Sequence, residues 1–417
     1  MSSEGHIQLV DHLFRHEAGK MVAVLAARFG LAHLQLAEDA VQDAFVQAGA
    51  TWRFGQLPAD PAAWLMRTAA NRAIDLLRRE GRWQRIQAGL SDSDTEAPPA
   101  HYHGQELADA QLQMIFACCH PALKPEDGIA LTLKTVSGFS AAEIARALMS
   151  SEAALQKRLA RARSFLREEG IRLEIPAGPA LRTRLDRVYT VLYLLFNEGY
   201  HSTKADEPIR RDLCGEAMRC CKLLVEHPAV RQPAAFALLA LMCFHAARFD
   251  ARLTSDNELI LLAGQDRTLW DQELIAVGRQ YLNEASRGTE LSRYHLEAAI
   301  AAEHCAAPRF NDTCWPRLLV LYDHLAAMCP TPAVRLARAV VLAETGDIAG
   351  AIGYVLATEG IETLLRTQYL FPAILGDLYK RLSETVKARA LLEQACALTP
   401  SPAERHLLQA KLETLRN

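Results

Sequence analysis

The chain has 417 residues, of which 50% are apolar and 23% are charged, and its formal net charge at pH 7 is −3. A chain of this length is too long for one typical core, so we expect two to four domains with the composition of an ordinary soluble globular protein. The slightly acidic balance argues against a protein that binds polyanions over its whole surface. Nucleic-acid binding must therefore be sought in local basic patches.

The N-terminus and the apolar runs favour a cytoplasmic protein. "MSSEGHIQLVDHLFRHEAGK" has no basic segment followed by an apolar one, and no run reaches the roughly 18 apolar residues of a membrane span. The ten cysteines include the adjacent pairs Cys118-Cys119 and Cys220-Cys221. In a cytosolic chain of this size we expect them to be reduced and buried.

Helical periodicity dominates the chain, and no β-branched stretch bounded by turns forms a strand series, which predicts an all-α protein. "SDSDTEAPPAHYHG", with three acids and two prolines, indicates an acidic extended linker, and "EIPAGPA" marks a second break. The predicted organisation is a helical domain at 1–90, a linker at 91–105, a helical domain at 106–173, a linker at 174–185 and a helical extension at 186–417.

The end of this extension carries a weak repeat near residues 333–404. Seven positions fall at the spacing of the tetratricopeptide helix-turn-helix consensus: Leu375, Gly376, Tyr379, Ala388, Leu392, Ala395 and Pro400. Small residues 37 positions upstream keep the same phase, so the period is slightly longer than the usual 34 residues. Such residues indicate either close helix packing alone or a concave surface for a protein partner.

The segment "GFSAAEIARALMSSEAALQKRLARARSFLRE" predicts a helix-turn-helix. Ser140 and Glu143 have the spacing of a capping box for the first helix, and Ser151 or Ser150 can cap the second. Met149 stands in the turn where a glycine is common, so the turn is made without the residue that most easily adopts a positive φ.

The outward face of the second helix is basic. Between residues 151 and 172 there are six Lys or Arg and three Glu, and Gln156 and Lys157 are placed to reach base edges in a major groove. The alternative is a solvated basic face on an ordinary helical hairpin. The polar and basic side chains of this face are Gln156, Lys157, Arg158, Arg161 and Arg163.

Two earlier helices carry opposite charge. "AEDAVQDAFVQA" places Asp39, Gln42 and Asp43 on one side, which suits a basic protein partner, and turns Phe45 towards the other. "PAAWLMRTAANRAIDLLRRE" carries Trp64 at core spacing within a basic helix that could bind a DNA strand and an unstacked base. Each segment could instead be a plain amphipathic helix. The polar residues of the basic helix are Arg67, Asn71, Arg72, Arg78 and Arg79.

Four stretches, taken together and in this order, resemble bacterial sigma factors of the extracytoplasmic-function group. They are "EDAVQDAF", "WLMRTAANRAIDLLRR", the acidic linker and "EIARALMSSEAALQKRLARAR". This resemblance covers about residues 5–170. The remainder, with "FACCHPAL", "LYLLFNEGY", "YHLEAAIAAEH" and the terminal repeats, resembles the subgroup with a long tetratricopeptide-like C-terminal extension.

The resemblance implies three binding surfaces. Asp39, Gln42, Asp43 and Phe45 match the helix that binds core RNA polymerase. Trp64, Asn71, Arg72 and Arg78, with their neighbours Arg67 and Arg79, match the helix that engages the minus-ten element of promoter DNA, and the loop 53–60 is placed to hold a flipped base. Gln156, Lys157 and Arg161, with Ser151, Arg158 and Arg163 beside them, match the helix that reads the minus-thirty-five element.

The implied function is that of a sigma factor without catalytic residues, metal or cofactor, whose C-terminal extension regulates it in cis. Two other functions fit the residues less fully: a stand-alone helix-turn-helix regulator and a helical-repeat adaptor. Phosphate loops, Gly-x-Ser-x-Gly elbows and His-Glu-x-x-His motifs do not occur. Cys118, Cys119 and His120 resemble metal ligands, but adjacent helical residues point in different directions.

The stretch "VLYLLFNEGYHS" changes from apolar to polar halfway along. We expect its apolar half to be a buried helix that stops at Gly199. Glu198, His201 and Ser202 could form an active site, but no second catalytic group elsewhere supports it. The preferred interpretation is a domain junction that consists of Asn197, Glu198, Gly199 and Tyr200.

Overall fold

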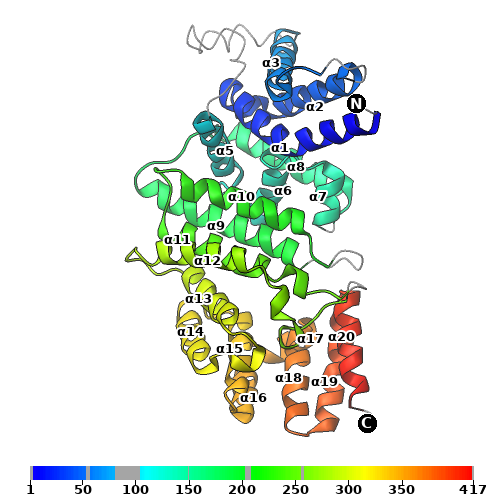
Figure 1. The fold of residues 1–417 in the computed structure, drawn as a ribbon, viewed down its shortest axis with the longest axis vertical. Helices are drawn as coiled ribbons and strands as arrows, with labels where there is room; N and C mark the ends of the chain where they lie inside the picture. Colours follow the sequence, from blue (N-terminus) through cyan, green and yellow to red (C-terminus); the bar gives the residue numbers. More distant parts are fainter. Residues whose placement is uncertain are drawn as a thin grey trace. The chain divides into compact units, whose positions relative to one another are not determined.

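The computed structural model describes residues 3–52, 57–79, 104–148, 150–201, 208–254 and 258–415. Within these ranges the secondary structure is helical, apart from one isolated bridge between Leu253 and Leu259. The prediction of an all-α protein is confirmed (Figure 1). The acidic linker predicted at 91–105 lies outside the described residues except for its last two, which begin a helix.

The chain divides into two compact units. Unit 1 comprises residues 1–195 and 222–230, and unit 2 comprises residues 196–221 and 231–417. The division falls inside two helices, α9 (Pro179–Tyr200) and α10 (Arg211–Glu226), each of which contributes one end to each unit. Helix α9 begins inside the segment 174–185 that was expected to be a linker, so the described linker is shorter than predicted.

Unit 1 is built around its first helix. Its helices are α1 (Ser3–Phe29), α2 (Leu34–Thr51), α3 (Pro61–Arg79), α5 (Gly104–Cys118), α6 (Pro125–Thr135), α7 (Ala141–Ala147) and α8 (Glu152–Glu168), with the start of α9 and the end of α10. Helix α1 contacts α2, α3, α5 and α6, whereas α8 packs on α6 and α7. The two predicted N-terminal domains therefore share one packed unit.

A glycine explains how closely α1 approaches the end of α6. A Cβ atom on Gly19 would lie 2.0 Å from the carbonyl oxygen of Val136, a distance that no side chain can occupy. Gly138, with φ of +70°, turns the chain directly afterwards. Glycine at these two positions lets the backbone of α1 pack against the segment that leads into the helix-turn-helix.

The start of α9 is held in unit 1 by two arginines. Arg184 donates from Nη2 to the carbonyl oxygen of Phe116 at 2.7 Å, and Arg187 donates to the carbonyl oxygen of Leu123. Both acceptors lie at or beyond the C-terminal end of α5, where helical carbonyl groups lack partners. The first turns of α9 thus belong structurally to the same unit as the helix-turn-helix.

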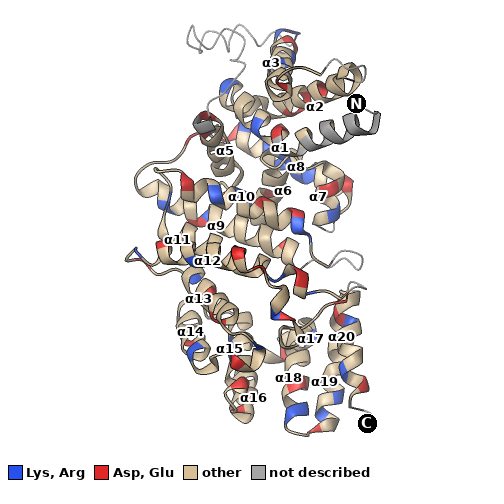
Figure 2. Ribbon diagram, in the orientation of Figure 1, with Lys and Arg blue, Asp and Glu red and all other residues tan. Residues whose placement is uncertain are grey.

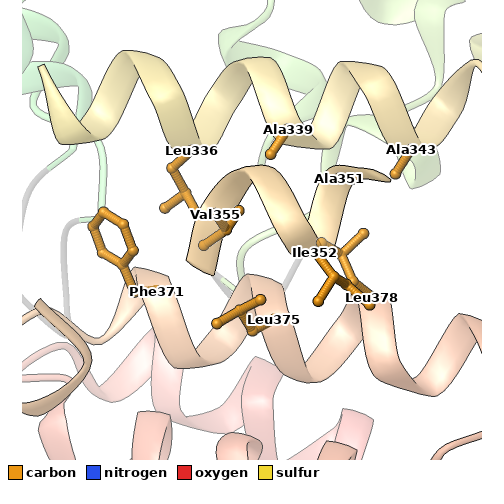
Figure 3. Close-up of a cluster of buried hydrophobic side chains, with 9 residues drawn as sticks. All are labelled: Leu336, Ala339, Ala343, Ala351, Ile352, Val355, Phe371, Leu375 and Leu378. Carbon is orange, nitrogen blue, oxygen red and sulfur yellow. The ribbon is translucent and has the colours of Figure 1, made fainter. Parts of the chain in front are cut away.

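Unit 2 is a succession of helices in which most contact the next. They are the end of α9, the start of α10, α11 (Pro233–Ala246), α12 (Gln272–Ala285), α13 (Arg293–Ala306), α14 (Trp315–Met328), α15 (Pro332–Glu344), α16 (Ile348–Leu356), α17 (Ile361–Thr367), α18 (Leu370–Arg381), α19 (Thr385–Leu398) and α20 (Pro402–Glu413). Figure 3 shows the core that α15, α16 and α18 share, with Ala339 and Ala351 among the buried side chains.

Helix α11 is buried within unit 2. The segment 233–251 has a window with mean hydropathy 1.4, so by length and composition alone it could cross a membrane, although no such run was expected. Two thirds of that window (67%) is buried within the protein, and α11 packs against α12 and α13. This is the situation of a core helix in a helical domain.

Candidate functional site

The acidic face predicted on α2 is open to solvent. Asp39, Gln42 and Asp43 are exposed, and Asp39 accepts a hydrogen bond from Nε2 of Gln35 at 2.9 Å. Phe45 lies on the other side of the helix, as the periodicity predicts: it is 5% exposed and packs edge-on against Phe14, with ring centroids 5.0 Å apart. Since it lies in the core, Phe45 supports the helix from inside and offers no surface to a partner.

The basic helix α3 also presents most of its predicted residues to solvent. Arg67, Asn71, Arg78 and Arg79 are exposed, whereas Trp64 is half-buried and packs edge-on against Trp52 at 5.4 Å. The buried inner residues of the helix are Ala63, Leu65, Met66, Ala69, Ala70, Ala73, Ile74 and Leu77. The amphipathic pattern therefore predicted the orientation of this helix correctly.

An ion pair joins the acidic face of α2 to the basic face of α3. Nε of Arg72 lies 2.6 Å from Oδ2 of Asp43, and both side chains keep more than a third of their surface exposed. An ion pair this exposed contributes about 0–1 kcal/mol, so it can exchange its partners at little cost. Arg72 and Asp43, expected to bind DNA and polymerase respectively, contact each other in this structure.

The helix-turn-helix has the caps that the sequence predicts. Oγ of Ser140 accepts from the backbone N–H of Glu143 at 3.2 Å, and Oε2 of Glu143 accepts from the N–H of Ser140 at 2.8 Å, which completes the capping box. Oγ of Ser151 accepts from the N–H of Ala154 at 3.2 Å, so Ser151 caps α8. The turn residue Met149 lies outside the described residues.

The basic face of α8 (Figure 2) divides into two groups. Ser151, Gln156, Lys157 and Arg161 are exposed and remain available to a partner. Two further arginines of the predicted DNA-binding set are only partly exposed because they form ion pairs inside unit 1. Arg158 lies 3.3 Å from Oδ1 of Asp127, and Arg163 lies 2.5 Å from Oε2 of Glu38.

The ion pair between Arg163 and Glu38 is the more buried of the two, with 15% and 7% of the side chains exposed. Burial raises the pKa of Glu38, an effect that the positive charges of Arg163 and Lys134 partly oppose. A carboxylate in such surroundings depends on its cation, because an unpaired buried charge is strongly unfavourable. The pair therefore ties α8 to α2, which was not predicted: no sequence pattern signals a contact between residues 125 positions apart.

Comparison with protein families agrees with this geometry. Residues 13–82, which carry α2 and α3, match Sigma-70 region 2, and residues 113–166, which carry the helix-turn-helix, match Sigma-70, region 4. These two regions indicate a sigma factor for transcription initiation. As a sigma factor the chain binds core RNA polymerase and promoter DNA in transcription initiation, and phosphodiester chemistry belongs to the polymerase.

The C-terminal part of this sigma factor matches a different family. Residues 184–286 match a family of unknown function, DUF6596, which spans α9 to α12 almost completely. The chain is also 34% identical over 389 residues to an uncharacterized protein of Rhizobium meliloti strain 1021, with 92% of this chain and 90% of that protein aligned. No solved structure matches the chain.

The cysteine pairs of the sigma factor lie in its core. Cys118, Cys119, Cys220 and Cys221 are buried, and Sγ of Cys118 lies 3.1 Å from Oγ1 of Thr135. Burial raises the pKa of the Cys220 thiol to about 11, which keeps it protonated at neutral pH. Across the described ranges no group of three His, Cys, Asp or Glu side chains is arranged to hold a metal ion.

The stretch Val191 to His201 is helical almost to its end, so Gly199 does not stop α9 as predicted. A Cβ atom on Gly199 would lie 2.7 Å from the carbonyl oxygen of Arg210 and 2.8 Å from Sγ of Cys214. The glycine is needed for this close approach to the start of α10. The predicted active-site residue Ser202 lies outside the described residues.

The sequence did not reveal that Tyr200 lies among basic side chains. Arg252 donates from Nη1 to the carbonyl oxygen of Tyr200 at 2.7 Å, and its guanidinium lies over the Tyr200 ring. A possible signal was the spacing of His245, Arg248 and Arg252, three basic residues at intervals of three and four at and just after the end of the apolar helix α11.

Proposed function

We propose that the exposed faces of α2, α3 and α8 are the polymerase, minus-ten and minus-thirty-five surfaces of this sigma factor. The proposal rests on the different charges of these three faces. Within one packed unit, α2 exposes acidic side chains, whereas α3 and α8 expose basic or amide side chains. A stand-alone DNA-binding regulator needs only the basic face of α8. The acidic face of α2 favours a sigma factor with a polymerase surface here.

The polymerase surface consists of Asp39, Gln42 and Asp43. Replacing both carboxylates, Asp39→Asn with Asp43→Asn, should weaken binding to core polymerase by on the order of tenfold, because each exposed charge contributes up to about 1 kcal/mol. The control is Glu168→Gln, since Glu168 is an exposed acid at the far end of α8. Equal affinity of the double variant and the control in a binding titration with core polymerase would refute this surface.

The minus-ten surface consists of the exposed Arg67, Asn71, Arg78 and Arg79, with Arg72 and the half-buried Trp64 beside them. The arginines can neutralise strand phosphates, and an aromatic ring partly open to solvent can stack on an unpaired base. Trp64 also packs on Trp52, so its substitution would affect stability. Arg78→Gln with Arg79→Gln is therefore the cleaner test, and promoter opening by the holoenzyme is the readout.

The minus-thirty-five surface is tested by Lys157→Ala with Arg161→Ala. Each side chain that contacts a phosphate contributes about one unit to the slope of log binding constant against log salt concentration. Promoter-dependent run-off transcription with core polymerase should fall, and the salt dependence should become shallower. Unchanged transcription would favour the adaptor alternative. Tight binding of free duplex without promoter-dependent transcript from the native protein would favour the stand-alone regulator.

We further propose that unit 2 regulates the sigma factor in cis through α9. This helix supplies residues to both units, and its end carries the junction residues Asn197, Glu198, Gly199 and Tyr200. Truncation before α9 would remove Arg184 and Arg187 from unit 1, so substitution is the better test. Asn197→Ala with Glu198→Ala should change promoter output, whereas Arg287→Gln, an exposed position in the same unit, should not. Unchanged output and unchanged stability of the pair would remove the junction role.

The tetratricopeptide-like surface for a protein partner remains a proposal that rests on α15 to α19. Close helix packing at small residues supports it: a Cβ atom on Gly376 would lie 2.9 Å from Cγ of Leu392. Successive helix pairs of this kind stack into curved surfaces. Because a sigma factor works where the polymerase is, we also place the protein in the cytoplasm.

A further inference from the structure

Basic side chains from three segments, together with the rings of Phe196 and Phe249, pack around the ring of Tyr200 at the end of α9. The ring centroid of His201 lies 4.8 Å from that of Tyr200, and the ring centroid of His245, on α11, lies 4.9 Å from it. The guanidinium carbon of Arg252 lies 3.7 Å from the same centroid. These residues are distant in sequence but all belong to unit 2. We call Tyr200, His201, His245, Arg248 and Arg252 the Tyr200 cluster.

Arg248 adds a second guanidinium to the cluster. Its Nε and Nη2 both donate to Oε1 of Gln265 at 3.2 Å, and its guanidinium lies 5.2 Å from the Trp270 ring centroid. Burial and the charges of Arg252 and Arg248 lower the pKa of His201 to about 4. Burial and the same two arginines, with His201 and His304, lower the pKa of His245 well below its usual value. At neutral pH the cluster thus has two charged guanidinium groups and two neutral imidazoles.

The positive charge of the cluster is not balanced by a carboxylate of the described chain. The charges that act on His201, His245 and Arg252 there are other basic groups, or Tyr200 and Cys214. Both arginines donate instead to neutral oxygens, the Gln265 amide and the Tyr200 carbonyl. Charges with little exposure are usually paired in proteins, so two guanidinium groups that act on the same histidines and donate to neutral acceptors are unusual.

Among the residues that the structure describes, the acids nearest in sequence have other surroundings. Burial alone raises the pKa of Glu198, with no cation contributing. Asp212 pairs with Arg210 at 2.7 Å, and Asp250 pairs with Arg211 at 2.6 Å. The buried Nδ1 of His245 has no hydrogen-bond partner among the described residues, which is a second indication of an absent ligand.

The cluster is reachable from solvent at one side. His201, at the end of α9, keeps part of its surface open to solvent although its ring is largely surrounded by neighbouring side chains, whereas Tyr200 and Arg252 are 5% and 7% exposed. A DNA backbone could touch only the outermost of these side chains, because it cannot enter between packed helices. A small anion is the class of ligand that could contact the partly exposed His201 and Arg248 together.

We propose that the Tyr200 cluster binds a small molecule that carries a phosphate group. A phosphate dianion matches the two guanidinium charges, and guanidinium groups bind its oxygens through paired N–H donors. Nη1 of Arg248 and Nη2 of Arg252 are not used in the hydrogen bonds described above, and each neutral imidazole has one N–H to donate. The inference goes beyond the sigma-factor function and does not depend on it, because binding is measured without polymerase or DNA.

The first experiment is thermal unfolding of the full chain in sodium phosphate, sodium acetate and sodium chloride at pH 7.5 and equal ionic strength. A ligand that binds only the folded state raises the Tm, and at one hundred times its Kd the expected rise is about 5 °C or more. Phosphate should raise the Tm above its value in chloride, and acetate, with one charge, should raise it less. No excess of phosphate over chloride would overturn the proposal. A larger rise in acetate would overturn the assignment to phosphate.

Substitutions show whether the phosphate-dependent rise in Tm comes from the Tyr200 cluster. His201→Gln changes an exposed side chain and should fold normally, and Arg248→Gln removes one guanidinium; both should lose most of the phosphate-dependent rise. Arg287→Gln removes an exposed arginine of unit 2 outside the cluster and should retain it. Histidine NMR signals give a separate readout, since a bound anion should raise the pKa of His201 from about 4. An equal Tm rise in all three variants, or no change in that titration, would show that phosphate binds elsewhere.

Discussion

Gly199→Ala should destabilise unit 2, although alanine ordinarily favours helices. The new Cβ atom would lie 2.7 Å from the Arg210 carbonyl oxygen, 2.8 Å from Sγ of Cys214 and 3.0 Å from the backbone nitrogen of Cys214. Overpacking of this kind costs about 1–3 kcal/mol, and two backbone atoms cannot rotate away, so we take the upper half of that range. The gain in helix propensity returns about 1 kcal/mol, which leaves a net loss of about 1–2 kcal/mol.

Gly215→Ala is the matched control, because Gly215 lies in α10 and a Cβ atom there would meet nothing within 4 Å. This variant should gain about 0.4–1 kcal/mol, since it loses only backbone freedom of the unfolded chain. Thermal unfolding of the full chain should therefore show shifts of opposite sign, a fall of about 2–8 °C for Gly199→Ala and a smaller rise for Gly215→Ala. Hydrogen exchange in peptides from the end of α9 should increase only in the Gly199→Ala variant. A rise in Tm for both variants would refute the close approach of α9 to the start of α10.

Three further predictions concern single side chains. Arg163→Met leaves the buried Glu38 without its cation and should lower the free energy of unfolding by about 3 kcal/mol at pH 8. The pKa of Glu38 is already raised and would rise further in the variant, and the protonated side chain needs no cation. The loss of stability measured by urea unfolding should therefore shrink towards pH 5. A loss that does not depend on pH would contradict this prediction. Ser140→Ala should cost about 1 kcal/mol and increase hydrogen exchange at the start of α7, whereas Ser140→Asn should preserve the cap. Cys314 is the exposed thiol among the ten cysteines, so a thiol reagent should modify it first in the native protein, and Cys314→Ser should remove that rapid phase.

Local structure could be predicted well because it depends on neighbours in the sequence. The capping box at Ser140 and Glu143 follows from their spacing and is present with both hydrogen bonds. The inward residues of α8, Leu155, Leu159 and Ala162, follow from helical periodicity and are buried. The exposed side of each predicted binding helix could therefore be predicted from the sequence, because a period of 3.6 residues determines which side chains lie on the same side.

Boundaries and long-range contacts could not be predicted in the same way. Proline is favoured at the first position of a helix as well as in linkers, so "EIPAGPA" indicated a linker where Pro179 in fact begins α9. Glycine near the end of an apolar run suggested a stop at Gly199, but close packing can require glycine inside a helix. The partner of Arg163 depends on the fold of the whole unit, so its burial could not be read from α8 alone.

The ion pair between Arg163 and Glu38 also limits how far α8 can lie from α2. The proposed minus-ten and minus-thirty-five surfaces would bind elements whose names place them about 25 base pairs apart, or about 85 Å at roughly 3.4 Å per base pair. Helix α3, which packs on α2, has 19 residues and is therefore about 28 Å long. While Arg163 contacts Glu38 at 2.5 Å, α8 lies against α2, on which α3 also packs. If the proposed surfaces of α3 and α8 bind both elements at once, we expect this contact to break first, so that the energy of one buried ion pair adds to the threshold for occupying a promoter.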